Sequence, residues 1–186
     1  MANRTGNYTA FYVNEPFNQS NLSANATRDF ITYNQLRMWK GADSSFPFVD
    51  SHDKNYNVRD SSDWESTLKP RLHDRLNKSK NIILILSSIT KDSRALREEI
   101  DFGINTNELP VIVIYPEYSE CSEIAEDGKR IKDSIEKLWN SVPIFKNSMK
   151  KVPTIHIPNK KSIIEKTLND SDFNVTTKCD PGIFFY

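Results

Sequence analysis

Two short runs of almost uninterrupted aliphatic residues constrain the fold of this chain more than any other feature. They are NIILILS at residues 81–87 and PVIVIYP at residues 110–116. A run of this length without polar alternation predicts a strand that is covered on both faces. Such strands are typical of parallel sheets with helices on either side, so the two runs predict an α/β fold.

The segments around these runs predict the rest of the sheet. Three further apolar segments are expected to form strands, YTAFYV (8–13), FPFVD (46–50) and VPTIHIP (152–158), and amphipathic patterns predict helices over 27–40, 62–78, 93–104, 123–139 and 160–169. Pro70 lies inside the second helical pattern and predicts a kink or break there. Strands that alternate with helices indicate right-handed βαβ units. We therefore expect a flavodoxin-like three-layer fold, with a five-stranded, mainly parallel sheet in the order 2-1-3-4-5.

Length and charge fit one neutral domain. The 186 residues predict a single domain over 1–186, with a core over about 8–170 and a tail over 171–186. Because 25 basic residues balance 25 acidic ones, no overall field favours nucleic acid or an acidic membrane. No segment approaches the roughly 20 apolar residues of a membrane span, and the start, MANRTGNYTAFY, lacks the apolar core of a signal peptide. We expect a cytoplasmic protein whose tail either packs against the body or contacts another subunit.

Several kinds of chemistry are disfavoured by the residues present. Cys121 and Cys179 lack metal-ligand spacing, and His52 has no partner at a recognisable spacing, so we expect no metal site. The chain holds five glycines and neither a Walker loop, a Gly-x-Gly-x-x-Gly motif nor a Gly-x-Ser-x-Gly motif. Phosphoryl transfer and Rossmann-type hydride transfer are therefore disfavoured.

Polar residues follow the first three predicted strands. Asn14 follows the first, Asp50 and His52 the second, and Ser87 and Ser88 the third. In a doubly wound sheet the site opens beyond the carboxyl ends of the strands, so these residues are expected to lie close together. A loop cluster rich in hydrogen-bonding groups suits a sugar or a nucleotide. The alternative for Asp50 is a turn former or a helix cap.

Two adjacent glutamates, Glu98 and Glu99, lie on the helix expected within SRALREEIDFGIN, residues 93–105. Leu96 and Ile100 form the buried stripe of that helix, and Glu99 borders the stripe. Glu98 lies about a hundred degrees further round. Amphipathicity allows either residue to be ordinary surface charge, and by itself it does not choose between them.

The segments taken together resemble the TIR-like family over residues 8–158, and within it the bacterial branch of the Thoeris antiphage systems. The most specific part is residues 79–100, where a Ser-x-x-x-x-x-Glu-Ile helix start follows the apolar strand. The family pattern is similar to Ser-x-Trp-x-x-x-Glu-Ile, and it places the serine at Ser93 and the catalytic glutamate at Glu99. Ala95 stands at the tryptophan position and departs from the pattern.

The resemblance implies the remaining site residues and partners. Substrate-facing positions would be Phe11, Tyr12, Asn14, Asp50, His52, Ser87 and Ser88. NAD would be a substrate, with no separate cofactor, and the product would be a cyclic ADP-ribose isomer. That signal would activate a partner effector that depletes NAD, after a phage trigger and with possible homo-oligomer assembly. Two other functions stay open: a TIR-type interaction module without catalysis, and a nucleoside deoxyribosyltransferase.

Overall fold

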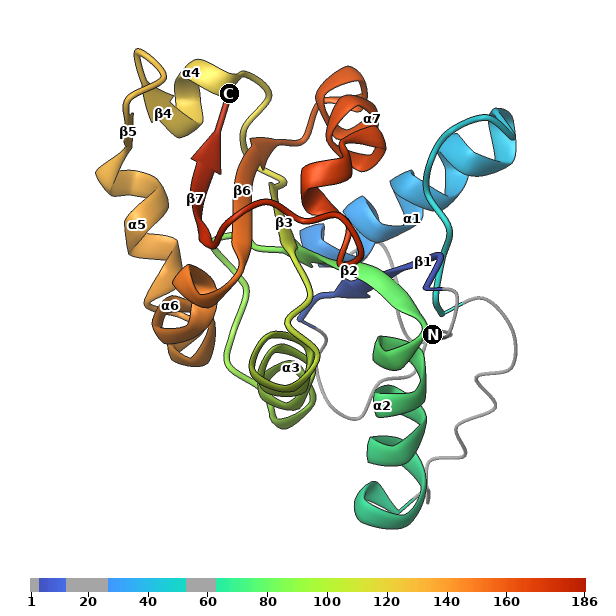
Figure 1. Ribbon diagram of the computed structural model, residues 1–186. Coiled ribbons are helices and arrows are strands. Elements are labelled where there is room, and N and C mark those ends of the chain that lie inside the picture. Colours follow the sequence, from blue (N-terminus) through green and yellow to red (C-terminus); the bar gives the residue numbers. More distant parts are fainter. Residues whose placement is uncertain (1–3, 13–26, 53–62) are drawn as a thin grey trace.

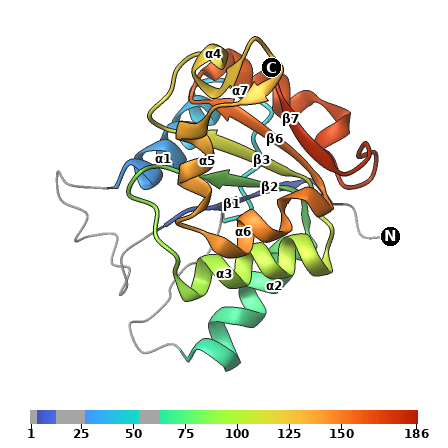
Figure 2. The ribbon, with the colours of Figure 1, turned by 90° about the vertical axis from the view of Figure 1, so that its left-hand side faces the viewer.

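One parallel sheet forms the centre of the protein, and helices cover both of its faces (Figures 1 and 2). The computed structural model describes residues 4–12, 27–52 and 63–186. The strands of the sheet are β1 (Gly6–Ala10), β2 (Ser79–Ile85), β3 (Val111–Tyr115), β6 (Pro153–Pro158) and β7 (Gly182–Phe185). They pair in the order β1-β2-β3-β6-β7, each parallel to its neighbour. The predicted α/β class is confirmed.

The helices alternate with the strands along the chain. They are α1 (Arg28–Ala42), α2 (Lys69–Asn77), α3 (Arg94–Ile100), α4 (Cys121–Ile124), α5 (Asp133–Trp139), α6 (Pro143–Ser148) and α7 (Lys161–Asn169). A π-helical segment, Trp64–Leu68, leads into α2, and another, Asp101–Thr106, continues α3. Short 3-10 turns follow α6 and α7 at Met149–Lys151 and Ser171–Phe173. Among the helices of the described residues, none is long and apolar enough to cross a membrane.

Alternation along the central strands creates two separate cores. Ile82 and Leu84 of β2 pack with the buried residues of α2, α3, α5 and α6. Ile83 and Ile85 pack on the opposite face with those of α1 and α7. The aliphatic run therefore has no solvent-facing side, which is why it lacks polar alternation.

The expected strand at residues 46–50 was wrong, because only Asp50 bridges to β1, opposite Asn7. The Asn7 N–H donates to the Val49 carbonyl at 2.7 Å, and the Asn7 side-chain oxygen accepts the Val49 N–H at 2.8 Å. The Val49 N–H thus donates to the Asn7 side chain, whereas a β-ladder would need a backbone carbonyl as the acceptor. The fifth strand is β7, which the tail adds beside β6. The relative order of the other four strands agrees with the prediction, while the sheet order differs in this detail.

The single helix expected over residues 123–139 was also wrong. The chain forms α4, a small antiparallel hairpin of β4 (Ala125–Glu126) and β5 (Arg130–Ile131), and then α5. The hairpin turn contains Asp127 and Gly128 with φ of 47° and 61°. This left-handed backbone suits the Asp-Gly pair of a hairpin turn, while α4 itself ends at Ile124, before the extended Ala125. At Pro70 the expected break takes the form of a change from π-helical to α-helical pitch, with the proline in the first turn of α2.

Candidate active site

Glu99 is held at the sheet by a capped helix. The Ser93 side chain caps α3 by accepting the Leu96 N–H at 3.2 Å. Leu96 and Ile100 are buried in the core, and this fixes the rotation of the helix. Glu99 then reaches β1, where its Oε1 accepts a hydrogen bond from the Tyr8 hydroxyl at 2.8 Å. Ser93 therefore begins the helix that carries Glu99, and Glu99 projects from the edge of the buried face of that helix.

Glu99 is a half-buried residue whose carboxyl group has a hydrogen-bond partner on only one of its two oxygens among the described residues. Its Oε2 atom is buried and has no hydrogen-bond partner among the described residues. Burial raises the pKa of Glu99 to about 8, against the opposing effects of the Tyr8 hydrogen bond and the charge of Arg75. Burial and the neighbouring carboxylate raise the pKa of Tyr8 well above its usual value, so Tyr8 remains a hydrogen-bond donor. A buried oxygen without a partner is costly to keep and is typical of functional sites.

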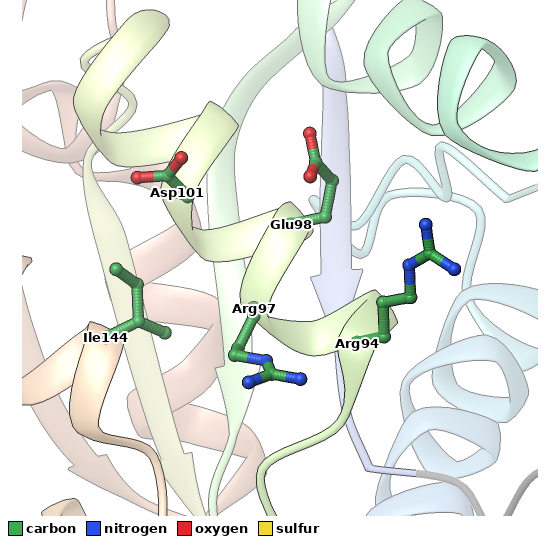
Figure 3. Close-up of a pocket in the computed structure, with 5 residues that line it drawn as sticks. All are labelled: Arg94, Arg97, Glu98, Asp101 and Ile144. Atoms are coloured by element: carbon green, nitrogen blue, oxygen red, sulfur yellow. The ribbon is translucent and has the colours of Figure 1, made fainter. Parts of the chain in front are cut away.

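Glu98 lies in a different environment. It pairs with His73 Nε2 at 2.7 Å and with Lys69 Nζ at 3.3 Å, both from α2. Figure 3 shows Glu98 projecting from α3 beside a shallow surface pocket, which is lined by Arg94, Arg97, Glu98, Asp101 and Ile144. The structure therefore separates the two glutamates: Glu99 contacts β1 in the interior, and Glu98 belongs to a surface ion-pair cluster.

Asp50 organises a second part of the site. Its carboxylate accepts hydrogen bonds from the Tyr33 hydroxyl at 2.7 Å and from the His52 N–H at 2.9 Å. Arg37 pairs with the same carboxylate at 3.6 Å. The Phe11 ring stacks on Tyr33 with their centroids 4.9 Å apart. Phe11, Asp50 and His52, three of the residues expected at the site, are thus neighbours.

His52 connects the two parts. Its Nε2 lies 2.8 Å from the Thr9 carbonyl oxygen, and its Nδ1 lies 3.4 Å from Arg75 Nη1. Its ring centroid is 4.8 Å from that of Tyr8, the partner of Glu99. Burial is the main cause that lowers the pKa of His52. The chain therefore brings Phe11, Asp50, His52 and Glu99 into one cluster around the end of β1.

The two serines after β2 bond elsewhere. Ser87 Oγ donates to the buried Asp29 at 2.5 Å, and Thr90 Oγ1 donates to the other oxygen of Asp29 at 2.7 Å. The Ser88 hydroxyl and its N–H both donate to the Glu117 carboxylate. Their hydrogen bonds therefore tie the end of β2 to the start of α1 and to the loop after β3.

Of the two remaining expected residues, the structure describes Tyr12 but not Asn14. Tyr12 lies beyond the end of β1, and its backbone hydrogen-bonds to Asp29. Asn14 lies outside the described residues. Asp29 therefore joins the exits of β1 and β2, where Tyr12 and Ser87 lie.

Sequence reasoning missed Tyr8 and Arg75, although both carried a usable signal. Tyr8 is on β1, two residues before Ala10, so the alternation of the strand turns both toward the core that contains α3. Arg75 follows the buried Leu72 by three residues and precedes the buried Leu76. It borders the buried stripe of α2 just as Glu99 borders that of α3.

Ala95, the departure from the family pattern, is half-buried on α3. An indole ring does lie at the start of this helix, but a different element supplies it. The Trp64 ring lies 4.7 Å from the guanidinium carbon of Arg94, the residue before Ala95. The aromatic group beside this helix start thus comes from the turn that leads into α2.

The cluster offers the chemistry of a carboxylate beside aromatic rings and does not offer a metal centre. Within residues 4–12, 27–52 and 63–186, no three His, Cys, Asp or Glu side chains are grouped so that they could hold a metal ion. When it is ionised, Glu99 places a negative charge on a carboxyl group whose Oε2 atom is buried, and in such a low-dielectric position stabilisation of a developing positive charge is most effective. Phe11 and Tyr33 supply flat ring surface in the part of the cluster around Asp50 and His52.

The sequence was compared with models of known protein families. The model described as "Thoeris protein ThsB, TIR-like domain" matches residues 8–121, which is more than half of the 186-residue chain. The matched range includes every residue of the cluster, from Tyr8 to Glu99. It ends after β3, so β6 and β7 lie beyond it.

Proposed function

The chain belongs to the family of TIR-like domains of the Thoeris protein ThsB, and on this premise we propose that it cleaves NAD during antiphage defence, with Glu99 as the catalytic carboxylate. The observation that carries the proposal is the buried Glu99 Oε2, which lacks a hydrogen-bond partner among the described residues. Tyr8 occupies the other oxygen. A ribose hydroxyl of a bound nucleotide would satisfy the Oε2 atom.

Cleavage of the bond between nicotinamide and ribose requires few catalytic groups from the protein. When it breaks, the electron pair leaves with the pyridinium nitrogen, and nicotinamide departs as a neutral molecule. No general acid is needed, in contrast to the two carboxyl groups used on ordinary glycosides. The ribose carbon becomes positively charged, and ionised Glu99 beside it would stabilise that charge. Loss of such a group costs about 2.7–4 kcal/mol of transition-state stabilisation.

The protonation of Glu99 fits this use. With a pKa of about 8, the carboxyl group is mostly protonated at neutral pH in the protein without substrate. The positive charge of the nicotinamide ring would favour the ionised form when NAD binds. Because only the ionised form stabilises positive charge, kcat/KM should rise with pH through about 8.

The product depends on the nucleophile that attacks the ribose carbon. Water would give ADP-ribose, and a group of the same nucleotide would give a cyclic ADP-ribose isomer; in both cases the nucleophile loses one proton. Intramolecular attack benefits from a high effective concentration. We propose the cyclic isomer as a signal made in the cytoplasm after a phage trigger. It would activate an effector of the ThsA type that depletes NAD, and NAD itself is substrate, with no further cofactor.

A plaque assay in cells that carry the intact defence system tests the proposal. Glu99→Gln removes the charge but retains the shape, and it should abolish protection. Glu98→Gln, on the adjacent residue with its own surface partners, is the matched control and should retain protection. Full protection by a soluble Glu99→Gln protein would contradict a catalytic role.

A second function, assembly without catalysis, is favoured by the outer face of α1. Ile31 and Met38 lie seven residues apart on that helix, and 54% and 71% of their surfaces are exposed. Residues at this spacing share one face of a helix. If assembly is the whole function, Ile31→Lys should abolish protection and Glu99→Gln should not.

A further inference from the structure

Arg75 is a half-buried cation between the two parts of the candidate site. It lies on α2, next to the buried Leu76, and its Nη1 is 3.4 Å from His52 Nδ1. Its charge acts on Tyr8, Tyr33, Asp50 and Glu99, and burial lowers its own pKa. A guanidinium group stays charged in proteins, so this position holds a permanent positive charge.

The hydrogen bonds of His52 require one protonation state. The Thr9 carbonyl oxygen can only accept, so Nε2 must carry the hydrogen. The Arg75 guanidinium can only donate, so Nδ1 must be the acceptor. Protonation of Nδ1 would break this hydrogen bond and place two cations side by side. Burial has the largest effect and lowers the pKa of His52; Asp50 and the Thr9 carbonyl favour the charged imidazole, whereas Arg75 and Arg37 oppose it.

Glu99 is affected by the same cation. From β1 the Tyr8 hydroxyl donates to its carboxylate, and from α2 the charge of Arg75 stabilises the ionised form. Its neighbour on α3, Glu98, pairs with His73 and Lys69 on the other side. Tyr8 and Arg75 are therefore the described groups that oppose the effect of burial on Glu99.

From this geometry we propose that Arg75 is a positioning residue that favours the ionised form of Glu99 and, together with burial, keeps His52 neutral, as the Nε2–H tautomer. Neutral His52 then ties the turn at Asp50 to β1 through the Thr9 carbonyl. The importance of this device for catalysis rests on the function proposed above for Glu99. The charge states themselves do not depend on that function and can be measured without NAD.

The test is a side-chain NMR titration of the full chain, with carbon-13 in the glutamate carboxyl groups and nitrogen-15 in the histidine rings. Arg75→Gln should raise the titration midpoints of both Glu99 and His52, each by about one pH unit. Arg75→Lys retains the charge and should leave both midpoints within about half a unit of wild type. Arg71→Gln removes an exposed arginine one turn earlier on α2 and serves as the control.

The titration midpoints of Glu99 and His52 should both rise in Arg75→Gln, although the lost positive charge affects the ionised forms of the two groups in opposite ways. Loss of a cation makes ionised Glu99 less stable and protonated His52 more stable, so both groups bind protons more readily. A general loosening of the site would instead expose both groups and move the two midpoints toward their ordinary values, down for Glu99 and up for His52. If Arg75→Gln does not fold, Arg75→Met gives the same readout.

The proposal would be overturned by midpoints of Glu99 and His52 that stay at wild-type values in Arg75→Gln. It would also be overturned if Arg75→Lys titrated like the neutral variant, because the effect would then not be one of charge. Failure of the proposed function looks different. In that case the NMR midpoints shift as expected, while neither wild type nor Arg75→Lys consumes NAD.

Discussion

Tyr8→Phe removes one oxygen atom from the candidate site and tests the environment of Glu99 directly. The Tyr8 ring is buried in the core, and phenylalanine retains that packing. The hydroxyl, however, is the described donor to Glu99 Oε1, at 2.8 Å. Without it, neither carboxylate oxygen has a hydrogen-bond partner among the described residues. The ionised form of Glu99 should therefore become less stable.

The size of the effect follows from that hydrogen bond. A hydrogen bond to a charged group contributes about 1.5–3 kcal/mol, and one pKa unit corresponds to about 1.4 kcal/mol. The pKa of Glu99, about 8 in the wild type, should thus rise by roughly one to two units. At pH 7.5 the ionised fraction then falls by roughly ten- to a hundredfold. The rate of NAD cleavage should fall by the same factor.

The assay is the pH dependence of kcat/KM for NAD. In Tyr8→Phe the rise of kcat/KM should move to higher pH, so the difference from wild type shrinks as the pH is raised. Tyr118→Phe, whose ring packs beside Tyr115 after β3, is a control and should leave the profile unchanged. A Tyr8→Phe protein that is folded and has the wild-type pH profile would refute the role given to this hydrogen bond.

Three further predictions concern residues outside the reacting centre. Glu98→Gln weakens the pair with His73, and since both side chains are partly exposed, urea unfolding should show a loss of about 0.5–1 kcal/mol; a loss above about 3 kcal/mol would contradict a surface pair. Burial lowers the pKa of His156 to about 3, below its usual 6.5, so its neutral form stabilises the fold above pH 6.5 and this stabilisation is lost as the pH falls toward 3. Thermal unfolding should show a slope of up to about 1.4 kcal/mol per pH unit there, and His156→Gln should flatten it. A Cβ atom on Gly103 would collide with Ile82 Cδ1, so Gly103→Ala should cost about 1–3 kcal/mol; an unchanged midpoint in urea would show that Ile82 can move aside.

The parts of the fold with the strongest local signals were predictable from the sequence. The aliphatic runs that form β2 and β3 carry their own evidence of burial, and they gave the parallel α/β class. Residues 46–50 have strand-like composition, but the Val49 N–H donates to the Asn7 side-chain oxygen, and the pairing of these residues with β1 is limited to one bridge. That contact spans 42 residues, and no local pattern reports it. The pairing of β7 with β6 likewise depends on a partner distant in sequence.

The candidate site was predictable to a similar degree. Helical periodicity placed Glu99 at the edge of a buried stripe, and the family pattern chose it over Glu98. Strand alternation turns Tyr8 toward the core that contains α3, but no local pattern pairs it with Glu99, because that contact joins residues 91 positions apart. The place of Arg75 beside His52 depends in the same way on how α2 packs against the sheet. Partners set by tertiary packing are therefore what the structure adds.

The central claim is that Glu99 is the carboxylate that acts on NAD, and one measurement tests it most directly. Lysates of phage-infected cells that express wild type, Glu99→Gln or Glu98→Gln would be analysed by mass spectrometry for cyclic ADP-ribose isomers. We expect the product with wild type and with Glu98→Gln, and none with Glu99→Gln. Equal amounts of the product with Glu99→Gln would contradict the claim, as would its absence in wild-type cells that survive infection.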